Sequence, residues 1–405
     1  MKKAEKSSRF SGLLQYKMFL LIFVINTIIN VGQQMINTLV PKYSSSLGFA
    51  ATIVGLISGM FSVSALCMRP AANLAFDRFG KKRMLLASSL LMCVAVLLYS
   101  FAHDSSMLIL ARILHGVSYG CIGPLCLALA GDSLPDEKIG SGIGIFTLAQ
   151  AIAQAIGPGI GLSLQTRLGY AGAFRCGMIV IFSAVLMIFA IKTDQPNPPV
   201  SSRLSWNRFF APEVVGPSVC LFFMAIAQSA IVSFLVIYGG LRGIENVGLY
   251  FTVHAIMLFA SRPLAGRLSD RFGFQYVVLP GIACSICAFF IISWSVSAWH
   301  LAAAAVFAAC GYGASQPAIQ AMSMKMISPA RRAVGANTNY IFTDLGAIVG
   351  SWLTGAVIDM VLPRVSAEAE AYAVSFRVMV LPMLLAALSF YIMHRKTAAK
   401  EVSHS

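Results

Sequence analysis

The sequence predicts an all-α integral membrane protein with twelve transmembrane helices, arranged as two pseudo-symmetric six-helix bundles. Three observations predict this class: an apolar composition, twelve apolar segments of membrane-spanning length, and an internal repeat. Of the 405 residues, 58% are hydrophobic and 11% are charged, whereas about 25% are charged in ordinary soluble domains. So apolar a chain is expected to lie in lipid, where helices satisfy their own backbone hydrogen bonds.

The apolar segments fall into two sets of six. A helix needs about 20 apolar residues to cross the hydrocarbon core, and a polar stretch rich in Pro and Ser divides the segments that meet this length. The predicted domains are an N-terminal bundle at 1–192, a cytoplasmic linker at 193–212 and a C-terminal bundle at 213–405. The predicted spans are 17–40, 49–75, 83–102, 106–131, 139–163, 170–192, 213–238, 246–268, 276–296, 299–326, 332–361 and 371–394.

The basic residues predict the orientation. With the N-terminus in the cytoplasm, 23 of the 30 Lys and Arg residues fall in cytoplasmic segments or nearby helix ends, and seven fall toward the outside. This is the positive-inside pattern, so we expect a multi-pass protein of the plasma membrane with both termini cytoplasmic. The net charge of +15 is then a topology signal. The basic runs are short and lack interleaved aromatic residues, so no nucleic-acid binding is expected.

Two motifs repeat at one offset of 193 residues. Residues 69–80, at the end of the second span, correspond to 262–273 at the end of the eighth. Tyr-Gly followed by Pro within 119–124 of the fourth span recurs within 312–317 of the tenth. A shared offset indicates two structural repeats of the same topology, related by an axis along the membrane normal. This layout is typical of alternating-access carriers, whose substrate site lies between the halves.

Over nearly its whole length the chain resembles the major facilitator superfamily. The loop motif of that family, Gly-x-Leu-x-Asp-Arg-x-Gly-Arg/Lys-Arg/Lys, is approached twice, although Asn73 and Ala75 replace Gly and Leu in the first copy. The resemblance implies that Asp77 caps span eleven and Asp270 caps span five, which would hold the outward-facing state closed at the cytoplasm. The alternative is a tight charged turn. The expected gating residues are Arg69, Asp77, Arg78, Gly80, Arg262, Gly266, Asp270, Arg271 and Gly273.

The first span carries a polar stripe. Asn26, Asn30, Gln33 and Asn37 lie within about 60° of one another at 100° per residue. Polar side chains on one face of a spanning helix point to protein or water, so the stripe is expected to line a substrate cavity. Interhelical hydrogen bonding is the alternative. Further cavity candidates, on other spans, are Gln150, Gln154, Gln228, Tyr312, Asn337 and Tyr340.

Three ionisable residues are candidates for proton coupling. Arg112 fits the family's Arg-x-x-x-Gly pattern, which resemblance associates with proton transfer, and His115 lies one turn further along the same span. A histidine can titrate near neutral pH, although a buried one is often only hydrogen-bonded. Asp344 lies near the middle of span eleven and is the acidic residue predicted at that depth. It is a candidate proton carrier, with a static partner of Arg112 or a hydrogen-bonded helix contact as the alternative.

Span five resembles the family's antiporter motif, Gly-x8-Gly-x3-Gly-Pro-x2-Gly-Gly. Ala153 and Leu162 depart from it. The resemblance implies export, whereas generic helix packing is the alternative reading of the same small residues. The residues that match are Gly144, Gly157, Pro158 and Gly161.

These patterns predict a secondary transporter that works as a monomer. The sequence has no HExxH, Walker loop or GxSxG motif, so an enzyme is not expected. No cofactor is expected, and no metal site, because all nine cysteines lie inside apolar segments. The expected partners are a small-molecule substrate, protons and the lipid bilayer. The favoured function is proton-coupled efflux of an amphipathic or drug-like compound. Proton-coupled uptake of a sugar or polar metabolite, favoured by the Asn/Gln stripe, and a non-transporting membrane sensor are the alternatives.

Overall fold

The structure, a computed structural model, describes residues 16–135, 146, 148–191, 210–328 and 331–404. At 69–78, 332–333 and 396–404 it describes the backbone alone. Throughout these residues the regular elements are helices, as the composition predicts. The elements are α2 (Lys17–Ser46), α3 (Ala51–Phe79), α4 (Lys81–Tyr99), α5 (Ser105–Asp132), α7 (Leu148–Ile188), η3 (Pro212–Val214), α8 (Val215–Leu241), α9 (Gly248–Phe272), α10 (Gln275–Ser293), α11 (Ala298–Lys325), α12 (Arg332–Val361), η5 (Leu362–Arg364), α13 (Glu368–Val378) and α14 (Val380–His404).

Each predicted span has a helical counterpart. Nine segments of the described chain are long and apolar enough to cross a membrane. One of them, α7, contains two limbs, while α9 and α11 occupy the places of the eighth and tenth spans with 25 and 28 residues. The last span is built from α13 and α14, which meet at Met379. The predicted all-α membrane fold is therefore confirmed.

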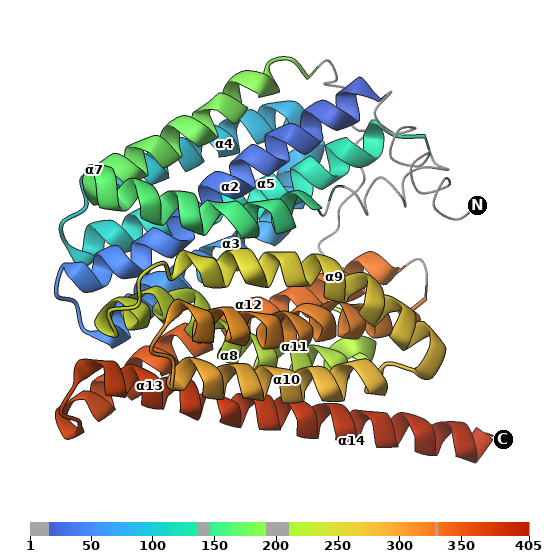
Figure 1. Cartoon of the computed structure of the whole chain (residues 1–405). Helices are drawn as coiled ribbons and strands as arrows, with labels where there is room; N and C mark the ends of the chain where they lie inside the picture. The colour runs from blue at the N-terminus through green and yellow to red at the C-terminus, as the bar shows by residue number, and fades with distance from the viewer. Residues whose placement is uncertain (1–15, 136–145, 147, 192–209, 329–330, 405) are drawn as a thin grey trace, which may run out of the picture. The chain divides into compact units, whose positions relative to one another are not determined.

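The chain reverses direction between the two limbs of α7 at a single residue. Gly169 has φ 71° and ψ 179°, which is not helical, and positive φ is readily adopted only by glycine. Figure 1 shows α7 as two helical limbs joined by a turn. The reversal lies six residues beyond the predicted end of span five at 163, because the polar Gln165, Thr166 and Arg167 still belong to the helix.

Contacts divide the chain into two units. The first comprises Met1–Leu39 and Ser64–Ser202, and the second comprises Val40–Val63 and Arg203–Ser405. The grouping thus places the end of α2 and the start of α3 with the second half of the sequence. The predicted domain division at 192 and 213 stays a prediction.

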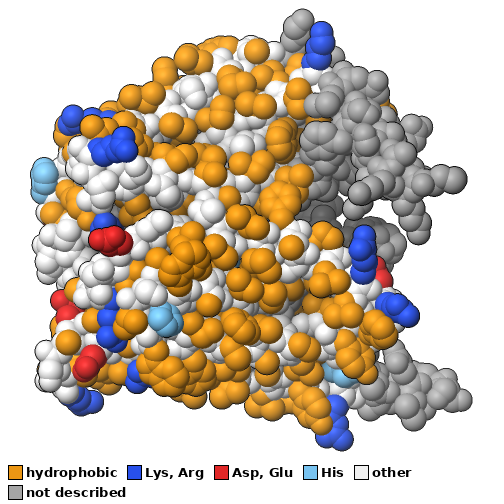
Figure 2. All heavy atoms as spheres, viewed as in Figure 1, with side chains coloured by type: hydrophobic (Ala, Val, Ile, Leu, Met, Phe, Trp, Pro, Cys, Tyr) orange, Lys and Arg blue, Asp and Glu red, His pale blue; other side chains and the backbone are white. Residues whose placement is uncertain are grey.

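Hydrophobic side chains cover the sides of the helices. Ile179, Phe189 and Leu381 are examples of large apolar residues that are more than half exposed. The face in Figure 2 is largely hydrophobic, with charged residues gathered toward the helix ends. Large exposed apolar surfaces are avoided in water, so these sides of the helices are expected to contact lipid.

In the first unit, α2 packs against both limbs of α7 through glycines. A Cβ on Gly157 would lie 2.7 Å from Cβ of Gln34. On the second limb, a Cβ on Gly177 would lie 2.9 Å from Cδ1 of Ile36. Small residues permit this close approach between helices in membranes. The polar stripe of α2 is thereby directed away from α7.

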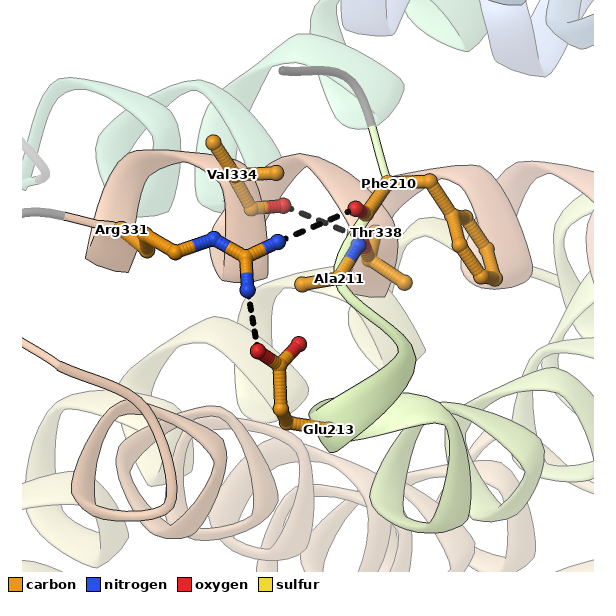
Figure 3. Close-up of polar contacts among 6 residues, drawn as sticks. All are labelled: Phe210, Ala211, Glu213, Arg331, Val334 and Thr338. Atoms are coloured by element: carbon orange, nitrogen blue, oxygen red, sulfur yellow. Dashed lines mark hydrogen bonds and ion pairs between the residues drawn. The ribbon is translucent and has the colours of Figure 1, made fainter. Parts of the chain in front are cut away.

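In the second unit, polar contacts attach the start of α8 to α12 (Figure 3). Arg331 forms an ion pair with Glu213, and its Nη2 donates to the carbonyl of Phe210 over 3.4 Å. The backbone N–H of Ala211 donates to Oγ1 of Thr338 over 2.9 Å. Ala211 and Thr338 are both fully buried, whereas the ion pair is partly exposed.

These burial differences predict unequal effects of mutation. Thr338→Val should lower the free energy of unfolding by about 1–3 kcal/mol, because the buried N–H of Ala211 loses its acceptor. Glu213→Gln should cost less than about 1 kcal/mol, because partly exposed ion pairs contribute little. Thermal denaturation of the two purified variants in the same detergent measures the difference. Equal melting temperatures would contradict the larger contribution of the buried Ala211–Thr338 hydrogen bond.

Candidate functional site

The polar stripe of α2 forms hydrogen bonds to α5. Nδ2 of Asn30 donates to Oδ1 of Asn26 over 3.0 Å, and Oδ1 of Asn30 accepts from the hydroxyl of Tyr119 over 2.9 Å. Asn37 accepts from Nη1 of Arg112 over 3.0 Å. The bonds of Asn30 to Tyr119 and of Asn37 to Arg112 are the interhelical contacts of the alternative interpretation. Two of the four stripe residues thus hold α2 against α5, while the bond between Asn26 and Asn30 stays within α2.

Gln33 differs from its neighbours on the stripe. Its side chain is 3% exposed, and neither its Oε1 nor its Nε2 has a hydrogen-bond partner among the described residues. A buried amide without partners costs free energy, and such a group calls for a water or ligand. The cavity role predicted for the stripe therefore depends chiefly on Gln33, and it stays a prediction.

Arg112 and His115 lie together in the first unit, where the spacing of one helical turn places them. Arg112 is 3% exposed, and His115 is fully buried. The hydroxyl of Tyr99, on α4, lies 3.3 Å from Nδ1 of His115, and Tyr99 also interacts with Arg112. The result is a buried polar cluster of one guanidinium, one imidazole, one phenol and the amide of Asn37.

The contact between Arg112 and Asn37 gives a testable stability effect. Asn37→Leu should lower the free energy of unfolding by about 1–2 kcal/mol, because a buried guanidinium N–H loses its acceptor. Thr38→Val is a matched control, since within the described chain Oγ1 of Thr38 donates to the carbonyl of Gln34 on the same helix. The melting temperature of each purified variant is the measurement. A larger shift for Thr38→Val would contradict the role of Asn37.

Asp344 lies in the second unit, twelve residues after the start of α12. An ionisable group of a further helix, Tyr312 of α11, interacts with it. Tyr312 of α11 interacts electrostatically with both Asp344 and Arg262, and Arg262 interacts with His254 of α9. The ring of His254 stacks on Tyr250 at 5.8 Å. Two predicted site residues, Asp344 and Tyr312, are thus brought together.

The other cavity candidates are less enclosed. Gln150 and Tyr340 are exposed, while Gln154, Gln228 and Asn337 are half-buried. Exposure on a spanning helix is compatible with lipid or with an aqueous path. Their predicted role in the cavity is not tested by these positions.

The two copies of the loop motif differ in what the structure describes. The side chains of Arg69, Asp77 and Arg78 lie outside the described residues, and Gly80 adopts φ 84° just before α4. In the second copy Asp270 pairs with Lys325 at 3.7 Å, with both side chains largely exposed. The start of span five, at 139–145, is not among the described residues. The predicted caps therefore stay predictions.

The remaining second-copy residues form the end of α9. Arg271 lies over the ring of Phe272 at 5.1 Å, and Gly273 ends the helix with φ 102°. Gly266 has open space where a Cβ would lie, so it makes no close helix contact within the described chain. These features fit the tight charged turn that the sequence also allows.

The antiporter-like motif packs against α2. A Cβ on Gly157 would lie 3.0 Å from the carbonyl oxygen of Val31, and one on Gly161 would lie 3.2 Å from Cα of Met35. Pro158 is buried within α7, and Gly144 lies outside the described residues. The described part of the motif thus sets the approach of α7 to α2.

Comparison with known proteins decides the family. The family model described as Major Facilitator Superfamily matches residues 22–247 and 218–405. The chain belongs to the major facilitator superfamily. It is accordingly a transporter of the membrane and not an enzyme.

Two similar proteins of this superfamily are known from Staphylococcus aureus. The chain is 21% identical over 369 residues to the staphylopine export protein of strain Mu50 / ATCC 700699. It is 22% identical over 367 residues to the quinolone resistance protein NorA of strain MRSA252. Each comparison covers 85% of this chain and 90% of the relative. The resemblance to drug-efflux facilitators is thereby confirmed.

Solved structures agree with the fold. A bacterial homologue of the human lysosomal transporter Spinster, in an inward-facing and unoccupied conformation, has a TM-score of 0.78 at 15% identity. That comparison covers 93% of this chain and 96% of the other. The nucleoside transporter NupG has a TM-score of 0.75 at 12% identity, covering 93% and 99%. At these identities the similarity concerns the fold alone.

Sequence reasoning missed Tyr99, which belongs to the first-unit cluster, and Tyr119, which bonds to Asn30 of the stripe. Tyr99 was not a candidate, because an aromatic residue near the end of an apolar span resembles many others. Tyr119 was noted only as part of the repeat. Its position on the same helical face as Arg112, seven residues and about two turns further along the span, was the available signal.

Proposed function

We propose that this major facilitator exports amphipathic small molecules in exchange for protons, as a monomer in the plasma membrane with both termini cytoplasmic. The observation that supports export as the direction of transport is the similarity to the staphylopine export protein and to NorA over 85% of the chain. The antiporter-like glycines of α7 support the same direction. The distribution of basic residues supports the orientation.

The amphipathic character of the cargo is supported by the small number of available polar groups. Asn26, Asn30 and Asn37 engage one another or residues of α5. The amide of Gln33 is left for a polar group of the substrate. A strongly hydrated solute needs many hydrogen bonds to replace its water, whereas a mainly apolar molecule needs few.

Proton coupling is assigned to Asp344, with Arg112 and His115 as supporting groups. A carboxylate within a span is costly to keep charged, so it binds a proton readily and releases it when hydrated or when approached by a cation. Its interaction with Tyr312 joins this group to α11. Substrate binding and proton release can therefore compete through the same helices.

Uptake of a polar metabolite is the second candidate. It is favoured by Gln33, whose buried amide can both donate and accept a hydrogen bond. One such amide also serves the polar end of an amphipathic molecule, so the direction of flux distinguishes the two functions.

The test uses everted membrane vesicles that contain the full-length protein and carry an imposed proton gradient, acidic inside. Ethidium is the amphipathic probe and a radiolabelled hexose is the polar one. We expect ethidium to accumulate in the vesicles and to leave when a protonophore is added. Accumulation of the hexose in right-side-out vesicles, with no movement of ethidium, would overturn export in favour of uptake. Vesicles from the same host without the protein are the control.

A further inference from the structure

The N-terminus of α3 is capped by a carboxylate from the other end of the sequence. Oδ1 of Asp359 accepts from the N–H of Ala51 over 2.9 Å, and Oδ2 accepts from the N–H of Thr52 over 2.8 Å. The first N–H groups of a helix have no partner within it, and the helix dipole favours a negative charge there. Both oxygens of one side chain satisfy two such donors.

The local sequence leaves this position without its own cap. Helices usually begin after Ser, Thr, Asp or Asn, whose side chains accept from the first turn, but Ala50 precedes α3. In contrast, α5 is capped by its own Asp104, which accepts from the N–H of Met107 over 2.7 Å. The start of α3 therefore depends on Asp359 for a cap that most helices supply themselves.

Glycines continue the contact along both helices. A Cβ on Gly355 would lie 2.2 Å from the carbonyl oxygen of Ala51, and one on Gly55 would lie 2.1 Å from that of Ser351. A Cβ on Gly59 would lie 2.8 Å from Oγ of Ser351. The two backbones are in direct contact over two helical turns of α3. We call this contact, at 51–59 and 351–359, the Asp359 clasp.

The clasp holds a helix that continues into the other unit. Residues 51–63 of α3 group with the second unit, whereas Ser64 onward groups with the first. Sharp bends in helices arise at Pro, Gly or local insertions, and 60–69 contains neither Pro nor Gly. We therefore expect 51–69 of α3 to move as one rigid piece, so that a movement of α3 relative to α12 separates the clasp and does not bend α3 at its middle.

The clasp is absent from the internal repeat. The residue 193 positions before Asp359 is Thr166, whose hydroxyl donates to the carbonyl of Ser163 within its own helix. Asp359 also lies outside both copies of the loop motif, which are at the other ends of α3 and α9. It is therefore a device of one helix pair and is not implied by the repeated motif.

We propose that Asp359 is a releasable latch, and that the carrier opens at the Asp359 end of α12 only when this carboxylate leaves the N-terminus of α3. The proposal rests on alternating-access transport. The latch stabilises the state closed at that end, and the glycines allow the closed backbones to meet. Loss of the latch shifts the population toward the state open at that end.

Accessibility of Ser351 measures the latch directly. Ser351 is 2% exposed and lies within the clasp, so Ser351→Cys reports its separation. The full-length protein, with its nine native cysteines replaced, is treated with a membrane-impermeant thiol reagent. Asp359→Ala should raise the rate of modification on the order of tenfold or more, because two hydrogen bonds to a charged acceptor are lost. Asp359→Asn, which keeps one acceptor oxygen, should give a smaller increase.

Asp104→Ala is the matched control, because Asp104 caps its own helix α5 and does not connect α3 to α12. It should leave the modification of Ser351→Cys unchanged. Hydrogen exchange of the same full-length proteins gives a second readout at the opposite ends of α3 and α12. Exchange there should fall in Asp359→Ala, since opening at one end closes the other. Local fraying of α3 would not change exchange at that distance.

A cross-link tests whether release is needed for transport. Oxidation of the Thr52→Cys, Asp359→Cys pair should stop ethidium flux, and dithiothreitol should restore it. Equal modification rates with and without Asp359, or full flux through the cross-linked protein, would overturn the latch. If the parent protein moves no substrate, the export proposal fails by itself, while the accessibility of Ser351→Cys still decides the latch.

Discussion

Asp344→Asn is expected to reduce proton-driven ethidium flux to the level of vesicles without the protein. Asparagine has nearly the same shape as the protonated carboxyl group but cannot release a proton. The variant should therefore fold, bind substrate and remain uncoupled from the gradient. Flux under an imposed pH gradient, and the melting temperature of the purified protein, are the two measurements.

Asp344→Glu is the control for this prediction, because it keeps an ionisable group on the same turn of α12. It should retain part of the coupling. If Asp344 is instead a static hydrogen-bonding residue, Asp344→Asn will lower the melting temperature and leave the coupling intact. Unchanged coupling would remove Asp344 from the mechanism, and the interaction with Tyr312 would then be structural.

Gly350→Ala is expected to destabilise the second unit by about 3 kcal/mol or more, and Gly350→Leu should yield no folded protein. A Cβ on Gly350 would lie 2.2 Å from the carbonyl oxygen of Ile226 and 2.6 Å from its Cα. Backbone atoms cannot turn aside as a flexible side chain can, so α8 and α12 must separate. Overpacking of this kind costs at least 1–3 kcal/mol, and more where the contact is to backbone.

Gly240→Ala on α8 is the matched control for Gly350→Ala, since nothing lies within 4 Å of its added Cβ. Replacement of a glycine by alanine in an open helix position should be neutral or slightly stabilising. The yield of monodisperse protein and its melting temperature report both variants. If the Gly350→Ala protein has the same melting temperature as the parent, α8 and α12 adjust to the added methyl group without loss of stability.

The sequence was sufficient for the class of fold but not for the partners of its polar groups. Helical periodicity placed Asn30, Gln33 and Asn37 on one face of α2, because side-chain direction follows from spacing along a helix. It could not show that Asn30 meets Tyr119 and that Asn37 meets Arg112. Those pairs depend on how α5 is rotated about its own axis, which packing decides.

Asp359 shows a different limit of sequence reasoning. As an acidic residue near the end of a span it looked unremarkable, since charged residues are expected at membrane boundaries. The available signal lay 308 residues away, where α3 begins after Ala50 with no polar side chain to cap it. A missing cap predicts a distant partner but does not identify it.

The turn at Gly169 restricts how the first unit can deform. Because the two limbs of α7 are joined through one residue, neither limb can slide along the other by a helical turn without breaking its own last hydrogen bonds. We therefore expect the two limbs to move together as one hairpin. Since Gly157 and Gly177 pack both limbs against the part of α2 that carries the polar stripe, we expect the stripe to move with that hairpin.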